Sequence, residues 1–89
     1  MEMIFKNQVV TRQQILDAMQ DFDAQHPNSG DFDNWLQKKN YIYKVRNAGY
    51  VYPPKHILSM ATGIPTTEFS GGEQTNRVFR QLGFEVKEK

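Results

Sequence analysis

The sequence contains no cysteine among its 89 residues. A disulfide framework, a thiolate nucleophile and every zinc site with cysteine ligands are therefore excluded, and the chain is compatible with a reducing compartment. No apolar run approaches the roughly 20 residues that a membrane-spanning helix needs, and the N-terminal stretch lacks the basic and long apolar regions of a signal peptide. We therefore expect a cytoplasmic protein without a membrane partner.

The chain is also too short for two domains, because one hydrophobic core usually occupies about 100 to 150 residues. Hydrophobic residues make up 38% of the chain and charged residues 24%, which is the composition of an ordinary small globular protein. We expect one domain over residues 1–89.

Neither sign of charge is in large excess, because 11 lysines and arginines face 10 acidic residues, for a net charge of +1. Such a balance does not by itself indicate nucleic-acid binding. The distribution is uneven, however, since residues 1–37 carry a formal charge of −4 and residues 38–89 a charge of +5. This asymmetry predicts a dipolar surface whose basic side could meet a phosphate backbone or an acidic protein patch. The alternative is that these charges are ordinary solvated faces.

Two stretches of helical spacing lie in the first half of the chain. Thr11 followed by Gln14 is a capping box, and the apolar residues after it predict a helix over about residues 11–25. Residues 31–39 contain apolar side chains one turn apart, and these predict a short helix that places the only tryptophan in the core.

Two further helices are predicted in the second half. A pair of prolines at positions 53 and 54 begins the first of them, and Gly63 closes it. Ser70 followed by Glu73 is a second capping box, which precedes the last helix. The predicted apolar stripe of this helix consists of Thr75, Val78, Phe79 and Leu82. Its outer face would carry Glu73, Arg77 and Arg80, with Gln74, Asn76 and Gln81 close by.

Strand signals lie on either side of these two helices. β-forming residues alternate with other residues after position 40, and Asn47-Ala48-Gly49 supplies a turn, so residues 41–52 are predicted to form a hairpin. Residues 84–87 alternate in the same way. Together the elements predict an α+β fold, in which a small antiparallel sheet of the hairpin and the C-terminal strand packs with three to four helices.

The residues offer little for catalysis. His26 and His56 are too few for a histidine-metal nuclease centre. The tripeptide Glu85-Val86-Lys87 resembles half of a carboxylate-x-lysine metal nuclease motif, but no convincing acidic partner lies upstream. We therefore expect no catalytic residue, no metal site and no cofactor.

Basic side chains of the second half favour contacts with a phosphate backbone. The candidate nucleic-acid-binding side chains are Lys44, Arg46, Lys55, Arg77 and Arg80. Backbone N–H groups of Gly71 and Gly72, at the start of the last helix, could seat one phosphate. Structural alternatives account for the same residues: the cap from Ser70 to Glu73 explains the glycines, and Glu73 and Arg77 are spaced as an i, i+4 ion pair.

Two blocks of the sequence carry a family resemblance. They are YKVRNAGYVYPPKHILSMATG and EFSGGEQTNRVFRQLGFEV. With the Thr11 helix start they extend over about residues 9–87, and they resemble the N-terminal head domain of ScoMcrA-like modification-dependent (type IV) restriction endonucleases. In that family a similar module precedes a sulfur-recognition domain and an HNH nuclease. The resemblance implies that cleavage and the reading of modified DNA belong to other domains.

The leading hypothesis is a non-catalytic accessory domain of a restriction or DNA defence protein, which contacts double-stranded DNA, modified or not, through its basic second half. The alternative is a protein-interaction or dimerisation module that docks onto a nuclease or ATPase domain through the hairpin tyrosines and the acidic first helix. DNA contact predicts binding that weakens with salt, whereas docking predicts association that does not.

Overall fold

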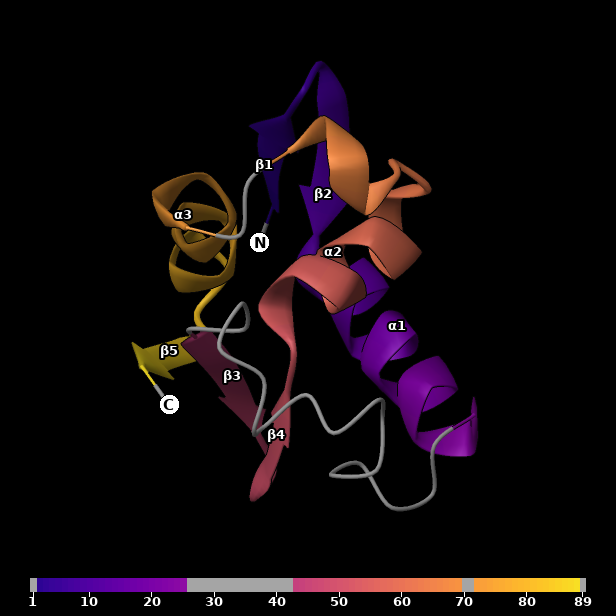
Figure 1. Ribbon diagram of the computed structural model, residues 1–89, viewed down its shortest axis with the longest axis vertical. Helices are drawn as coiled ribbons and strands as arrows, with labels where there is room; N and C mark the ends of the chain where they lie inside the picture. Colours follow the sequence, from indigo (N-terminus) through magenta and orange to yellow (C-terminus); the bar gives the residue numbers. More distant parts are fainter. Residues whose placement is uncertain (1, 26–42, 70–71, 89) are drawn as a thin grey trace.

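Two small antiparallel sheets and three α-helices form the described part of the computed structural model (Figure 1). The structure describes residues 2–25, 43–69 and 72–88. In chain order the elements are β1 (Glu2–Phe5), β2 (Gln8–Thr11), α1 (Arg12–Gln25), β3 (Tyr43–Asn47), β4 (Tyr50–Tyr52), α2 (Pro54–Thr62), the 3-10 helix η3 (Thr66–Glu68), α3 (Glu73–Gln81) and β5 (Glu85–Glu88). The predicted α+β class is confirmed, and the helix predicted for residues 31–39 lies outside the described residues.

The N-terminal hairpin is absent from the sequence-based expectations. β1 and β2 pair in antiparallel fashion, with Glu2 opposite Thr11. Lys6 and Asn7 form the turn, and their φ angles of 51° and 64° are those of a type I′ turn, whose twist suits two antiparallel strands. The Lys-Asn pair lacks the glycine that usually marks such a turn, so the local pattern gives little signal.

The second sheet has the strand order β4-β3-β5, and both pairings are antiparallel. It therefore contains the predicted hairpin and the predicted C-terminal strand. The hairpin turn falls at Ala48 and Gly49, whose φ angles of 53° and 85° again indicate type I′. On the inner face, Val45 is completely buried and lies opposite Tyr52 and Val86 on the neighbouring strands. The alternation leaves Lys44, Arg46, Glu85 and Lys87 on the outer face.

The first predicted capping box is confirmed. The backbone N–H of Gln14 donates to Oγ1 of Thr11 at 3.1 Å, and the backbone N–H of Thr11 donates to Oε1 of Gln14 at 3.0 Å. The predicted end of the next helix is also confirmed, since Gly63 is left-handed and its N–H donates to the carbonyl of Ser59 at 2.8 Å.

The start of helix α3 differs from the second predicted capping box, and Ser70 of that box lies outside the described residues. Helix α3 has Gly72 as its N-cap, without a side-chain hydrogen bond, so Glu73 is the first residue of the helix and not the third. The chain therefore turns into the helix at Gly72, two residues later than the Ser70 cap would require.

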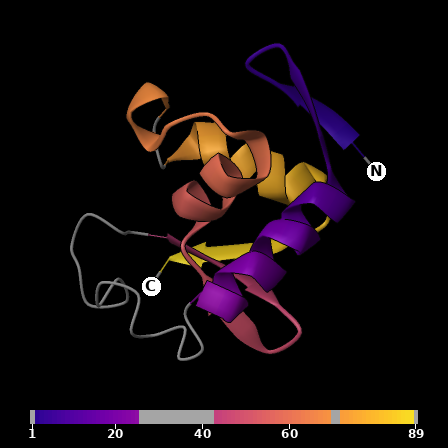
Figure 2. The same cartoon turned by 90° about the vertical axis from the view of Figure 1, so that its right-hand side faces the viewer.

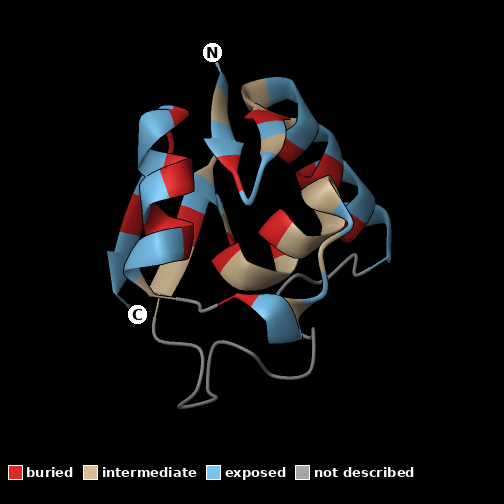
Figure 3. Ribbon diagram, turned by 90° about the horizontal axis from the view of Figure 1, so that it is seen from above, coloured by how far each residue is buried: buried red, intermediate tan, exposed pale blue. Residues whose placement is uncertain are grey.

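Helix α2 packs against both α1 and α3 and lies between them in Figure 1, and Figure 2 shows the three helices from the side. Buried positions lie on the sides of the helices that face the interior (Figure 3). The largest completely buried apolar side chains are Phe22, Phe79, Ile15, Ile57, Leu58 and Leu82. Because α2 lies in the centre, the outward faces of α1 and α3 point to opposite sides of the molecule. The charged side chains on these two faces are therefore kept apart.

Candidate nucleic-acid interface

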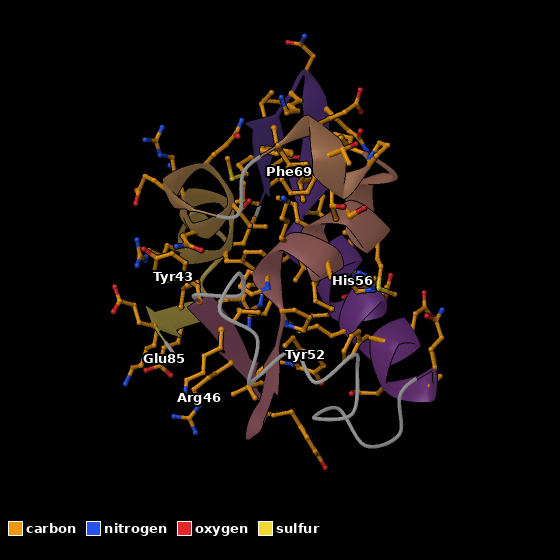
Figure 4. The ribbon with its side chains drawn as sticks, in the orientation of Figure 1. Tyr43, Arg46, Tyr52, His56, Phe69 and Glu85 are labelled. Carbon is orange, nitrogen blue, oxygen red and sulfur yellow. The ribbon has the colours of Figure 1, made fainter. Side chains whose placement is uncertain are left out.

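Four of the candidate phosphate-contacting side chains lie on elements that adjoin one another. Lys44 and Arg46 belong to β3, β3 pairs with β5, and β5 packs against α3. Arg77 and Arg80 are exposed on α3. These three elements form one side of the molecule, on the left in Figure 4. We call this side the basic flank and define it by Lys44, Arg46, Arg77, Arg80 and Lys87.

Helix α1 carries the opposite charge on the opposite side of the molecule. Its acidic side chains Asp17, Asp21 and Asp23 are all exposed, and α1 lies on the right in Figure 1. Among the described residues, the acidic side chains of α1 and the basic flank therefore lie on opposite sides of the molecule. An anionic polymer would be attracted to the basic flank and repelled from α1.

The outer face of β3 and β5 sets two like charges against each other. Lys44 lies opposite Lys87, and Arg46 lies opposite Glu85. Like charges directly opposite destabilise the pairing of strands. The Glu85 carboxylate lies 3.0 Å from Nζ of Lys87, and the hydrogen bond and charge of Lys87, with the charge of Arg46, hold the pKa of Glu85 below its usual range. One carboxylate thus offsets only part of the positive charge of this face, which therefore favours an anion.

The exposed side of α3 differs from the prediction in two ways. Glu73 pairs with Arg80, at 3.8 Å between Oε2 and Nη1, rather than with Arg77 as its spacing predicts. Both side chains are well exposed, and such pairs contribute little to stability, so Arg80 can exchange Glu73 for a phosphate at small cost. Asn76 is not on this face at all: it is 1% exposed, and its Oδ1 has no hydrogen-bond partner.

The remaining candidate residues are Lys55, Gly71 and Gly72. Lys55 lies in the first turn of α2, half-buried, with Nζ 5.9 Å from the centroid of the Phe69 ring. Gly72 is the N-cap of α3, where an added Cβ would meet no atom within 4 Å. Gly71 lies outside the described residues. The structure therefore does not bring Lys55 together with the other four basic side chains.

Sequence reasoning missed Arg12, the first residue of α1. Its Nη1 donates to the carbonyl oxygen of Leu82 at 2.6 Å, and its guanidinium carbon lies 4.2 Å from the centroid of the Phe84 ring. Leu82 is the C-cap of α3, so Arg12 ties the start of one helix to the end of another. The two bonded residues are 70 positions apart, and no local pattern signals such a contact.

Arg12 and Arg46 line one open pocket of about 460 Å³. Its walls come from the start of α1, the β3–β4 turn and the connection from α3 to β5. We call it the arginine pocket, and its lining residues are Arg12, Arg46, Asn47, Ala48, Gly49, Gly83, Phe84 and Glu85. The pocket adjoins the outer face of β3 and β5 through Arg46 and Glu85, which belong to both.

The three hairpin tyrosines in the described part of the chain differ in exposure and do not form a common binding surface. Tyr52 is only 2% exposed, packs edge-on against Phe22, and donates its hydroxyl to Oδ2 of Asp23 at 2.8 Å. Burial and this hydrogen bond raise the pKa of Tyr52 above its usual range. Tyr50 is 59% exposed, Tyr43 is half-buried, and Tyr41 lies outside the described residues. Tyr52 is therefore a core residue and is unavailable for base stacking or docking.

An exposed apolar pair lies on the N-terminal hairpin instead. Ile4 is 61% exposed and Val9 is 45% exposed, and the two lie directly opposite each other on β1 and β2. Large apolar side chains paired on an outer sheet face are a feature of docking surfaces. The sequence pattern does not reveal this pair, because the hairpin itself is not predicted.

The described ranges hold neither a metal-ligand cluster nor a membrane-spanning helix. Among residues 2–25, 43–69 and 72–88, no three histidine, aspartate or glutamate side chains are grouped so as to hold a metal ion. Across the same residues, no helix is long and apolar enough to span a membrane.

Comparison with known proteins gives one family. A family model described as "ScoMcrA-like, N-terminal head domain" matches residues 8–88. No curated protein and no solved structure matches the chain. The chain belongs to the ScoMcrA-like N-terminal head domain family, as the resemblance of the hairpin and SGG blocks predicts. Membership is consistent with an accessory role in restriction.

Proposed function

We propose that this head domain is a non-catalytic module that contacts the phosphate backbone of double-stranded DNA for a restriction protein. The observation that carries the proposal is the arrangement of the basic flank. Arg77 and Arg80 are exposed on α3, which packs against β5, and Lys44 and Lys87 oppose each other on the outer face of β3 and β5. Like charges that lie opposite each other in a sheet destabilise the fold. An anion bound over the two side chains reduces their repulsion.

The charge pairs of the basic flank also suit exchange with a ligand. Arg80 and Lys87 each contact one glutamate, at 3.8 Å and 3.0 Å, on largely exposed side chains. Exposed ion pairs hold their partners weakly and are screened by salt. A phosphodiester can therefore displace Glu73 or Glu85 without uncovering a buried charge. Contacts of this kind carry no base specificity, so any reading of sequence or modification would lie elsewhere in the restriction protein.

The test is a titration of the protein with a short labelled duplex at about 50 and 200 mM salt. Three to five phosphate contacts would weaken binding about 40-fold to about 500-fold between these two concentrations. We expect Arg77→Ala/Arg80→Ala to lower the affinity about tenfold at low salt and to reduce the salt dependence.

Lys55→Ala is the control, because it removes a positive charge from α2, outside the basic flank. A change below about twofold is expected for it. An absence of duplex binding at low salt would overturn the proposal. If each charge removed from α3 and the charge removed from α2 lowered the affinity equally, binding would depend on the net charge of the protein and not on the basic flank.

A docking module remains the second candidate function, and the pair of Ile4 and Val9 is the observation that favours it. The partner would be a nuclease or ATPase domain of the same defence system. Ile4→Thr/Val9→Thr keeps strand-forming residues and removes the exposed apolar surface. Co-sedimentation with such a domain that persists at 200 mM salt and is lost in this variant would support docking. Association that disappears with salt would argue against it.

A further inference from the structure

We propose that the arginine pocket binds a phosphate group, and that in the DNA complex it holds one phosphodiester at the edge of the basic flank. The assignment to DNA rests on the proposed function. Arg12 is the residue this inference adds, since it belongs to the acidic half of the sequence and is not among the candidate side chains identified there.

Arg12 is held in a fixed orientation. The bond from Nη1 to the Leu82 carbonyl, at 2.6 Å, anchors one end of the guanidinium, and the Phe84 ring at 4.2 Å supports its plane. A guanidinium has several N–H donors in a rigid fork, and the bond to Leu82 uses one of its nitrogens. Arg12 is also a lining residue of the pocket, beside Phe84, so its remaining N–H donors can serve a ligand there at little further loss of side-chain freedom.

Arg46 supplies the second cation from a different element. It lines the same pocket from β3, with its side chain exposed. The one carboxylate of the lining, Glu85, lies 3.0 Å from Lys87 and is thereby partly neutralised. Two guanidinium groups against one engaged carboxylate leave the pocket positive, and paired arginines are suited to the tetrahedral oxyanion of a phosphate.

The other walls fit a phosphate better than a nucleobase. Phe84 is the aromatic residue of the lining, but it is buried and its ring is covered by Arg12. A base would therefore find no aromatic face on which to stack. A Cβ added at Gly49 in the turn would meet no atom within 4 Å, so the wall is low there and a backbone phosphate can approach. The volume of about 460 Å³ leaves room for a phosphate with its flanking sugars.

The pocket is tested first without DNA, by adding inorganic phosphate at constant ionic strength and following backbone amide resonances. We expect saturable shifts at Gly49 and Gly83, and none at Gly63, which closes α2 outside the pocket lining. Arg46→Lys keeps the positive charge but replaces the paired N–H donors of the guanidinium with one ammonium group, so it should weaken phosphate binding at least fivefold. Shifts that do not saturate, or that are unchanged in Arg46→Lys, would overturn the site.

The duplex titration then separates this inference from the proposed function. In Arg12→Gln/Arg46→Gln, the slope of log affinity against log salt should fall by the amount expected for about one lost phosphate contact, while Arg77 and Arg80 still bind the duplex. An unchanged salt dependence, with a loss in Arg77→Ala/Arg80→Ala, would overturn the pocket and leave the proposed function standing. Phosphate binding without any duplex binding would overturn the assignment to DNA. Circular dichroism checks the fold, and Arg46→Gln alone replaces the double variant if loss of the Arg12 anchor unfolds the chain.

Discussion

The hydroxyl of Tyr52 donates a 2.8 Å hydrogen bond to the carboxylate of Asp23, and this bond joins the end of strand β4 to the last turn of α1. The Tyr52 ring is buried against Phe22, whereas Asp23 is exposed. The bond therefore lies at the rim of the core. It holds the acidic helix against the sheet that carries the basic flank, so it helps to keep the two charged sides of the molecule in a fixed relation.

Tyr52→Phe should lower the free energy of unfolding by about 1 kcal/mol near pH 8, because it removes one hydrogen bond and keeps the ring in the core. The difference should shrink as the pH rises above about 10. Tyrosine in the unfolded chain then loses its proton, while the raised pKa of Tyr52 keeps it protonated in the fold. At pH 11 this favours the unfolded wild type by about 1.4 kcal/mol, which cancels the advantage of the bond.

Urea denaturation of both proteins at pH 8 and pH 11 measures this effect. Tyr50→Phe is the matched control, because Tyr50 is 59% exposed and its replacement should leave stability unchanged at both pH values. A gap between wild type and Tyr52→Phe that stays constant from pH 8 to pH 11 would contradict the prediction.

Thr11→Ala should destabilise the protein by about 1 kcal/mol, since it removes the N-cap of α1. Because Thr11 and Gln14 each accept a hydrogen bond from the other's backbone, Gln14→Ala should cost less on a Thr11→Ala background than alone. A double-mutant cycle in urea measures this coupling. Gln20→Ala, exposed farther along α1, is the control, and strictly additive losses would argue against a reciprocal cap.

The features that the sequence predicts are those with a local cause. The Thr11 cap, the turn at Gly49 and the closure at Gly63 each depend on residues a few positions apart. Alternation likewise identifies Val45 and Val86 as inward-facing. The sequence predicts the strands β3 and β5. Their pairing brings Lys44 opposite Lys87 on the basic flank, and the sequence does not give this register.

Other features depend on distant contacts and leave no local signal. Arg12 reaches Leu82 across 70 positions, and Arg12 is also one of the residues that line the arginine pocket. The N-cap of helix α3 is Gly72, although the spacing of Ser70 and Glu73 favours an earlier start. The tertiary fold overrides the local capping signal at this position.

Asn76 allows a test of how much an unsatisfied buried oxygen costs in stability. Its Oδ1 is buried without a hydrogen-bond partner, and leaving a buried acceptor unsatisfied costs about 1 to 3 kcal/mol. Asn76→Ala removes that atom and improves helix propensity, at the expense of a small cavity. We expect the free energy of unfolding to rise by about 1 kcal/mol.

Chemical denaturation of Asn76→Ala and of the wild type measures this difference in the free energy of unfolding. Gln81→Ala, which changes an exposed amide on the same helix, controls for helix propensity. A loss of stability in Asn76→Ala, with no loss in Gln81→Ala, would mean that packing around the Asn76 side chain outweighs its unsatisfied oxygen.

Glu85→Gln should strengthen duplex binding about threefold at low salt, because Glu85 competes with phosphate for Lys87 and Arg46. Lowering the pH of the wild type from 7 to 5 should not reproduce this gain, since the lowered pKa of Glu85 keeps its carboxylate ionised over that range. Glu68→Gln, exposed on η3, removes the same charge outside the basic flank and should change affinity less than twofold. Equal gains in both variants would indicate a response to net charge alone, whereas weaker binding in Glu85→Gln would show that Glu85 orients the two cations for the phosphate.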